Sequence, residues 1–323
     1  MAEITKTASI LYVVISMKIN RKTLSLFITC LLLVLSLAVA GCMQQDGEQS
    51  PDNNETTSEE TKSIKLGSTT WDDGRATSNV FKHILESKGY EVELVYGDLG
   101  GVYQGLADGN LDFYVSAWLP GTQGNYWDRH NEDLIMVNNL STGARTGLVV
   151  PSYIPVDSIE ELNEHKDEFD GKIQGIEPGA GIMKQTENAI DEYNLDYELQ
   201  SSSTVGMATE LGDAVKEEEW IVVTLWNPHW SFSRMQQEYG VDLKYLEDSK
   251  DVYGESDNIT MIAREDFGED YPEVYDMATR SKMDISEIES MMLGIEKGMS
   301  PENASQNWID NNPEKVNEWL GDK

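Results

Sequence analysis

Cysteine is nearly absent from this chain of 323 residues, which contains only Cys30 and Cys42. Both lie in the N-terminal segment, so the rest of the chain has neither a cysteine pair for a disulfide bond nor thiolate ligands for a metal. The histidines are widely spaced and form no metal-binding pattern. The sequence also lacks a phosphate-binding loop with its lysine and a G-x-S-x-G nucleophile motif. We therefore expect no metal, no cofactor and no catalytic residues, and we do not expect an enzyme.

Basic residues are scarce as well. The chain has 24 lysines and arginines against 58 aspartates and glutamates, a formal net charge of −34. Binding to phosphates needs a basic face, so nucleic acid is excluded as a partner. An acidic surface repels itself at low ionic strength and is relieved by salt. The composition therefore fits either a salty habitat or ordinary solubility.

Long apolar runs are missing except for residues 24–40, "LSLFITCLLLVLSLAVA". No later stretch reaches the ~18–20 apolar residues that a membrane-spanning helix needs, so the chain is not itself a channel or permease. Basic "MKINRK" precedes the run and "VAGC" follows it, which is the pattern of a targeting segment. "VAGC" resembles the lipobox of bacterial and archaeal lipoproteins, which implies cleavage before Cys42 and a lipid on that residue. We expect residues 1–42 to be a lipoprotein signal, with Met17 as an alternative start and an uncleaved transmembrane anchor as the alternative reading. Either way the mature domain would lie outside the cytoplasmic membrane.

Residues 43–63 contain almost no apolar side chain and predict a disordered tether. From residue 64 onward, strand-like and helix-like segments alternate, as in "IKLGSTTW", "SNVFKHILESKG" and "YEVELVYG". This alternation predicts an α/β fold with a mostly parallel sheet covered by helices.

Two segments are predicted to connect two lobes. The strand-like "TGLVVPSYIP" at residues 146–155 runs into two prolines, and the strand-like "DNITMIARE" at residues 257–265 carries the chain back. We expect residues 64–150 to form lobe I, residues 151–256 to form lobe II, and residues 257–323 to return to lobe I as helices. Two lobes joined by two crossings predict a hinged binding protein with a ligand cleft.

Three tryptophans come at the carboxyl ends of predicted strands. Trp71 follows "IKLGSTT", Trp118 follows "LDFYVSA", and Trp226 follows "WIVVTL". Ligands of open α/β sheets bind at this edge, although any single tryptophan there could simply be a packing residue. Indole faces attract cations that cannot donate hydrogen bonds, above all quaternary ammonium groups. Together the three predict a cage for such a cation.

The motif "GIEPGAGIM" predicts a site for an anion. It leads from a strand into a helix, so the amides of Gly179, Gly181 and Ile182 should be free of acceptors at the helix start. In "WNPHW", Pro228 suits the first turn of another helix, and His229 would then lie beside the cleft as a donor to a carboxylate, although a lone histidine is usually structural. A cation cage and an anion site together predict a zwitterionic ligand.

The motifs "TTWDD", "SAWLPGT", "EPGAGIM" and "WNPHWSFSR" resemble those of the glycine betaine-binding lipoproteins of ABC transporters, from about residue 65 to the C-terminus. The resemblance implies a two-lobed periplasmic-binding-protein fold of type II-like architecture. It also implies capture of glycine betaine and related betaines for uptake as osmoprotectants, a permease in the membrane as partner, and a monomer. Carried over by motif, it implies two sets of ligand contacts: a cation cage of Trp71, Trp118 and Trp226, and a carboxylate site of Gly181, Ile182 and His229.

Other readings stay open at this point. The ligand could be another quaternary ammonium or sulfonium compound such as choline or carnitine, although choline has no carboxylate for the second site. Asp72 and Asp73 follow Trp71 and leave open whether a carboxylate also approaches the cation. A sensor lobe that presents its ligand to a receptor has the same sequence features as a transport protein.

Overall fold

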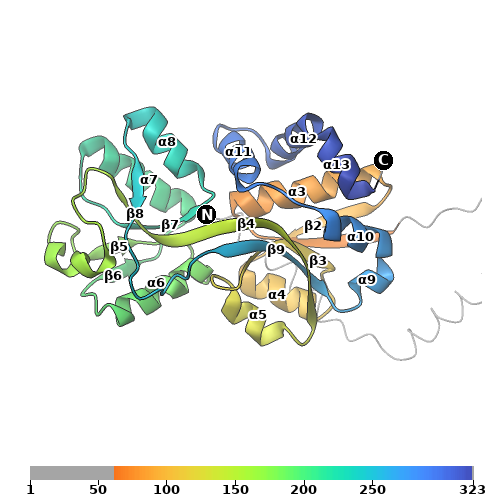
Figure 1. Cartoon of the computed structure of the whole chain (residues 1–323), viewed down its shortest axis with the longest axis horizontal. Helices are drawn as coiled ribbons and strands as arrows, with labels where there is room; N and C mark the ends of the chain where they lie inside the picture. The colour runs from red at the N-terminus through yellow and green to blue at the C-terminus, as the bar shows by residue number, and fades with distance from the viewer. Residues whose placement is uncertain (1–61, 322–323) are drawn as a thin grey trace, which may run out of the picture. The chain divides into compact units, whose positions relative to one another are not determined.

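The structure is a computed structural model that describes residues 62–321 (Figure 1). The signal segment with Met17 and Cys42, and the tether up to residue 61, lie outside the described residues. Ser63, which its composition placed in the tether, is the first residue of the first strand. Within the described part of the chain, no helix combines the length and the apolar character needed to cross a membrane.

Lobe I begins with a small parallel sheet, because β1 pairs in parallel with both β2 and β3. Its first elements are β1 (Ser63–Ser68), α3 (Asp72–Ser87), β2 (Glu91–Tyr96), α4 (Leu99–Ala107), β3 (Phe113–Leu119) and α5 (Gly124–His130). Helix α3 forms on the sheet because Ala76, Val80 and Ile84 recur at four-residue steps and are all buried. Strand β3 is buried along its whole length, which places the end that carries Trp118 in the interior.

Strand β4 (Leu134–Pro151) is shared by the two lobes. Its first part pairs with β9 (Asp257–Arg264), and its last part pairs with β7 and β8. The apolar pattern at residues 146–155 marked only the end of this strand. The earlier part, "LIMVNNLSTGAR", is half polar and interrupted by register shifts, so its sequence carries no clean alternation.

Lobe II is a second small sheet with helices, in which β5 pairs in parallel with β6 and β7. Its elements are η1 (Ile159–His165), β5 (Lys172–Gln174), α6 (Gly181–Glu192), β6 (Glu198–Gln200), α7 (Thr204–Glu217), β7 (Val223–Asn227), α8 (Trp230–Tyr239) and β8 (Leu243–Tyr245). The chain then returns to lobe I through β9.

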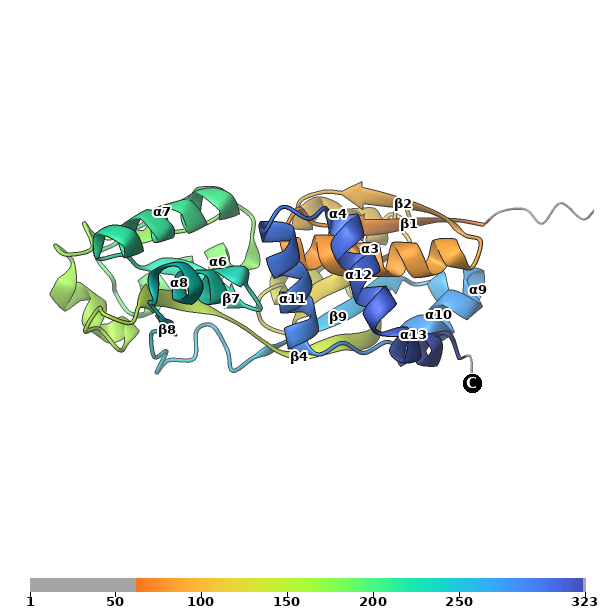
Figure 2. The same cartoon turned by 90° about the horizontal axis from the view of Figure 1, so that it is seen from above.

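Five helices complete lobe I after β9. They are α9 (Phe267–Asp270), α10 (Pro272–Arg280), α11 (Ile285–Glu296), α12 (Pro301–Asn311) and α13 (Pro313–Leu320). Helices α11 and α12 pack against α3, as Figure 2 shows from above. Trp319 of α13 stacks on Phe81 of α3 with ring centroids 5.8 Å apart. The C-terminal helices therefore cover the core that α3 begins.

The α/β class predicted from the sequence is confirmed, but the prediction of a mostly parallel sheet is wrong for its centre. The strand order is β2-β1-β3-β9-β4-β7-β5-β6, and β9 runs antiparallel to both β3 and β4. Strand β4 carries the chain out of lobe I and β9 carries it back, so the two run in opposite directions. Figures 1 and 2 show both strands leading from one lobe toward the other.

Candidate functional site

A cavity with about 350 Å³ of empty space, partly open to solvent, lies between the lobes. Two predicted tryptophans of lobe I, Trp71 and Trp118, line it. Trp226, Gly181 and Ile182 line it from lobe II. Five of the six residues for which the sequence predicted a role in ligand binding therefore line one cavity.

The local structure explains why the three indoles reach the cavity. Trp71 precedes the first residue of α3, at the turn between β1 and that helix. Trp118 and Trp226 are the next-to-last residues of β3 and β7, and both are more than nine-tenths buried. The carboxyl ends of these strands face the gap between the lobes, which is the usual ligand edge of an open α/β sheet.

The indole of Trp118 is fixed by a buried carboxylate that also lines the cavity. Its Nε1 donates to Oδ2 of Asp73 at 3.1 Å, and Ser116 Oγ donates to the same oxygen at 2.9 Å. Burial raises the pKa of Asp73, while these two hydrogen bonds act in the opposite direction. A carboxylate thus does approach the predicted cation cage, which the sequence had left open.

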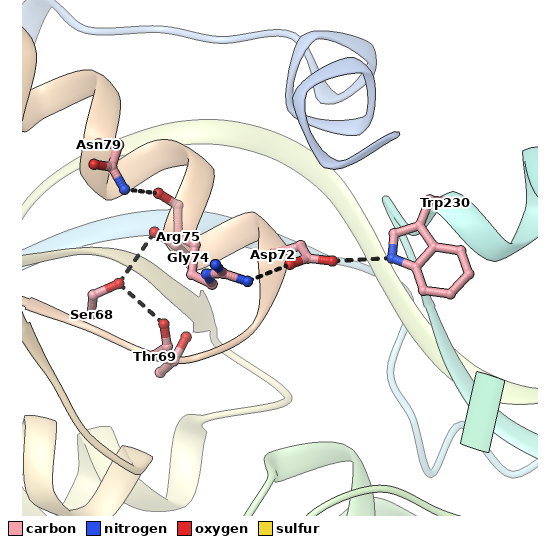
Figure 3. Close-up of polar contacts among 7 residues, drawn as sticks. All are labelled: Ser68, Thr69, Asp72, Gly74, Arg75, Asn79 and Trp230. Atoms are coloured by element: carbon pink, nitrogen blue, oxygen red, sulfur yellow. Dashed lines mark hydrogen bonds and ion pairs between the residues drawn. The ribbon is translucent and has the colours of Figure 1, made fainter. Parts of the chain in front are cut away.

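Two tryptophans, Trp71 and Trp230, donate to carboxylates of the opposite lobe. Trp71 Nε1 donates to Glu177 Oε2 at 3.3 Å. In the reverse direction, Trp230 Nε1 donates to Asp72 Oδ2 at 3.1 Å, the contact drawn in Figure 3. Glu177 had no role predicted from the sequence, although it lies within the motif "EPGAGIM". Nothing local in the sequence distinguishes it from the many exposed glutamates of this acidic chain.

The start of α6 brings unpaired amides to the cavity. Ala180 precedes the helix, and Gly181 and Ile182 are its first residues. Within residues 62–321, the amides of Gly181 and Ile182 have no hydrogen-bond acceptor, as expected for a first helical turn. Gly181 also touches lobe I, because a Cβ atom at this position would lie 2.0 Å from the carbonyl oxygen of Thr122. Only a glycine permits this approach.

His229 lies behind the cage and does not itself line the cavity. Its ring is 1% exposed, with centroids 4.5 Å from Trp226 and 4.8 Å from Trp230. Burial lowers its pKa from 6.5 to about 3, so the imidazole is neutral at physiological pH. Nδ1 accepts a hydrogen bond from the amide of Ser231 at 3.1 Å, which leaves the ring proton on Nε2 as a donor.

The position of Pro228 differs from the sequence-based expectation. Helix α8 begins at Trp230 and is capped by His229, so Pro228 precedes the cap and does not lie in the first turn. The pattern "NPHW" allowed either position. The histidine takes the capping role because its Nδ1 accepts from the second amide of the helix, which proline cannot do.

Residues 62–311 match the family described as the substrate-binding domain of ABC-type glycine betaine transport systems. The chain belongs to this family. Members of this family are substrate-binding domains of transport systems and not enzymes, and substrate-binding proteins of ABC importers are extracytoplasmic.

Characterised substrate-binding domains resemble the chain in sequence and in structure. It is 40% identical over 168 residues to the glycine betaine/carnitine transport binding protein GbuC of Listeria monocytogenes, over 51% of this chain and 53% of the relative. The chain thus matches about half the length of that protein. Lactococcal OpuAC, solved in a closed form with glycine betaine, is 36% identical, with a TM-score of 0.75 over 80% of this chain and 99% of that one. ProX of Borrelia burgdorferi is 32% identical, with a TM-score of 0.76, and the match covers 80% of this chain and 96% of ProX. These likenesses confirm the two-lobed periplasmic-binding-protein fold.

Proposed function

We propose that this chain captures glycine betaine outside the cytoplasmic membrane and delivers it to a separate ABC permease for uptake as an osmoprotectant. One observation carries the proposal: three indoles and the first turn of α6 line the same cavity between the lobes. The ligands named for its relatives support it, since GbuC is a glycine betaine/carnitine binding protein and OpuAC was solved with glycine betaine.

The trimethylammonium group would lie among Trp71, Trp118 and Trp226. Each desolvated cation–π contact contributes about 2 kcal/mol. Three faces support roughly micromolar binding after the entropic cost of association. Asp73 at the cavity wall holds the indole of Trp118 in place through its Oδ2.

The carboxylate of the betaine would accept hydrogen bonds from the amides of Gly181 and Ile182, where the dipole of α6 favours an anion. His229 would add a donor through Nε2, the nitrogen that carries its proton. Because burial keeps the ring neutral, His229 contributes a hydrogen bond and no charge. This half of the site separates betaines from cations that have no carboxylate.

The route to the membrane is part of the proposal. Cys42 would carry a lipid in the cytoplasmic membrane, and the tether would let the folded domain reach the permease. The domain would act as a monomer, with one ligand closing its two lobes. Mass spectrometry of the protein from membranes of its native host tests the lipid, because an acylated Cys42 at the mature N-terminus is expected.

Calorimetric titration of the purified protein with glycine betaine, proline betaine and choline, at low and high salt, tests the function. We expect tight one-to-one binding of the betaines and weaker binding of choline. No heat from any quaternary ammonium compound under either condition would contradict the cage and the function with it.

A second candidate is a protein for other quaternary ammonium or sulfonium compounds, such as carnitine or choline. Asp73 is a buried acidic residue that lines the cavity. In its ionised form it would favour a ligand with a net positive charge over a zwitterion. Choline binding as tight as that of glycine betaine in the same titration would support this alternative. A sensor protein would show the same three affinities as a transport protein. Deletion of the gene distinguishes the two roles, because only loss of a transport protein abolishes betaine uptake.

A further inference from the structure

The indole ring of Trp71, a residue of lobe I, is oriented by a hydrogen bond to lobe II. It lies at the start of α3 in lobe I, and its Nε1 donates to Oε2 of Glu177, which follows β5 in lobe II. A hydrogen bond between two lobes exists only while the lobes are together. The ring of this cage tryptophan is therefore held in its final position only in the closed form.

Glu177 is prepared for this contact by its own lobe. Its Oε1 accepts from the amide of Thr204 at 3.0 Å, and its Oε2 accepts from Oγ1 of Thr204 at 2.9 Å. Thr204 is the first residue of α7, where the helix dipole also favours a carboxylate. The acceptor thus stays in place when Trp71 is absent and needs no rearrangement when the lobes meet.

The residue next to Trp71 makes the reverse contact. Asp72, the first residue of α3, accepts from Nε1 of Trp230, the first residue of α8 in lobe II, as Figure 3 shows. Arg75 holds the other carboxylate oxygen of Asp72 at 3.3 Å. The Trp230 ring lies 4.8 Å from His229, whose ring lies 4.5 Å from Trp226. This contact therefore reaches the wall of the cage that lobe II supplies.

We propose that Glu177 and Asp72 are positioning residues of the ligand site, which form with Trp71 and Trp230 a two-way clasp that couples assembly of the cage to closure of the lobes. The proposal rests on the betaine-binding function proposed above. Each carboxylate accepts a hydrogen bond from an indole N–H of the opposite lobe, so we assign each a role through that indole. The clasp makes the cage complete in the closed state alone, which gives the ligand a differential affinity for that state.

A double-mutant cycle tests the half of the clasp at Trp71. Glu177→Ala should weaken glycine betaine binding about tenfold, the loss expected for a hydrogen bond to a charged group. Trp71→Phe removes the indole N–H and keeps an aromatic ring, so Glu177→Ala should have little further effect in that background. Glu177→Gln retains an acceptor and should restore most of the affinity.

Thr204→Val is the matched control, because it removes one hydrogen bond of Glu177 to α7 and leaves the contact with Trp71. We expect this variant to bind within about threefold of wild type, since the amide of Thr204 still holds the carboxylate. Additive losses in the cycle, or an affinity of Glu177→Ala equal to that of wild type, would overturn the positioning role of Glu177. Melting temperatures of all ligand-free variants separate loss of affinity from loss of folding.

The contact between Trp230 and Asp72 is tested by the dissociation rate of glycine betaine, measured by stopped-flow tryptophan fluorescence. Asp72→Ala should release glycine betaine about tenfold faster, whereas Asp72→Asn keeps an acceptor for Trp230 and should stay close to wild type. Equal dissociation rates in wild type and Asp72→Ala would contradict the clasp. Wild-type protein that binds no betaine would instead overturn the proposed function, so the two failures are distinct.

Discussion

Indole nitrogens and carboxylates pair repeatedly around the cavity. Trp118 donates to Asp73, Trp71 to Glu177, and Trp230 to Asp72. A tryptophan held by its nitrogen keeps its face in a fixed direction, which a cation–π site requires. The acidic side chains next to the cage therefore orient the indole rings by accepting hydrogen bonds from them.

Replacement of Trp118 or Trp226 by alanine should weaken glycine betaine binding by about 2 kcal/mol, roughly thirtyfold, because one cation–π face is lost. Trp220, which packs edge-on against Phe169 in lobe II with centroids 5.1 Å apart, is the control, since it lies outside the cavity lining. Calorimetry measures the three affinities. An unchanged affinity for Trp118→Ala or Trp226→Ala would remove that residue from the cage.

His229→Ala should weaken glycine betaine more than choline, because only the betaine has a carboxylate for Nε2 to bind. Titration of both ligands against wild type and variant measures the difference. Equal losses for the two ligands would assign His229 to packing between Trp226 and Trp230 alone.

His229 also makes a prediction about pH. Its pKa is about 3 in the folded protein and 6.5 when exposed, so the unfolded state binds more protons between these values. The free energy of unfolding should therefore fall as the pH drops below 6.5, by up to about 1.4 kcal/mol per pH unit from this residue. Denaturant titrations of wild type and His229→Gln between pH 7 and 5 isolate the contribution. A pH dependence that is the same in both proteins would contradict the buried, neutral histidine.

At the scale of the elements, the site depends on how close α6 comes to the loop after β3. Gly181 begins α6, and its Cα faces the carbonyl of Thr122. The loop is held by Asp257, which accepts hydrogen bonds from the amides of Gly121 and Thr122 at 2.6 and 2.9 Å. The first turn of the helix therefore meets lobe I only if its first residue has no side chain.

Gly181→Ala should weaken glycine betaine binding by at least about tenfold, since a Cβ would lie 2.0 Å from the Thr122 oxygen and keep the lobes apart. Alanine is about 1 kcal/mol better than glycine in a helix, so the ligand-free variant should be no less stable. Gly124→Ala is the control, because Gly124 also begins a helix but has open space around its Cβ position. Similar affinities of both variants for glycine betaine would show that the contact at Gly181 is not needed for binding.

At the scale of the whole described domain, β4 and β9 are the strands that connect the two lobes. A ligand that contacts both lobes favours the closed state by its differential affinity. Small-angle scattering should therefore show a smaller radius of gyration when glycine betaine is added, and Trp226→Ala should need more ligand for the same change. A radius that does not respond to saturating betaine would contradict closure on the ligand.

Much of the architecture was predictable because its causes are local. Strand ends, a glycine-rich helix start and the apolar stripe of α3 are set by neighbours in the chain, so the three strand-end tryptophans and "GAGIM" are enough to predict one shared ligand site. Parallel pairing in the outer strands of each lobe followed from the alternation of strands and helices. The polar, bulged first part of β4 and the antiparallel path of β9 escaped prediction because their partners lie far away along the chain.

The sequence by itself determined which residue types stand at the strand ends and helix starts, and with them the family of the chain. Only the tertiary structure decided what each of them touches. Glu177 meets Trp71 across 106 positions of sequence and Trp230 meets Asp72 across 158, and no local pattern encodes such pairs. The same holds for His229, whose pKa falls because the packed protein buries its ring, which lies against Trp226 and Trp230. Burial and contact between lobes arise only when the chain packs. The pairing of the indoles with carboxylates and the low pKa of His229 could therefore be found only in the tertiary structure.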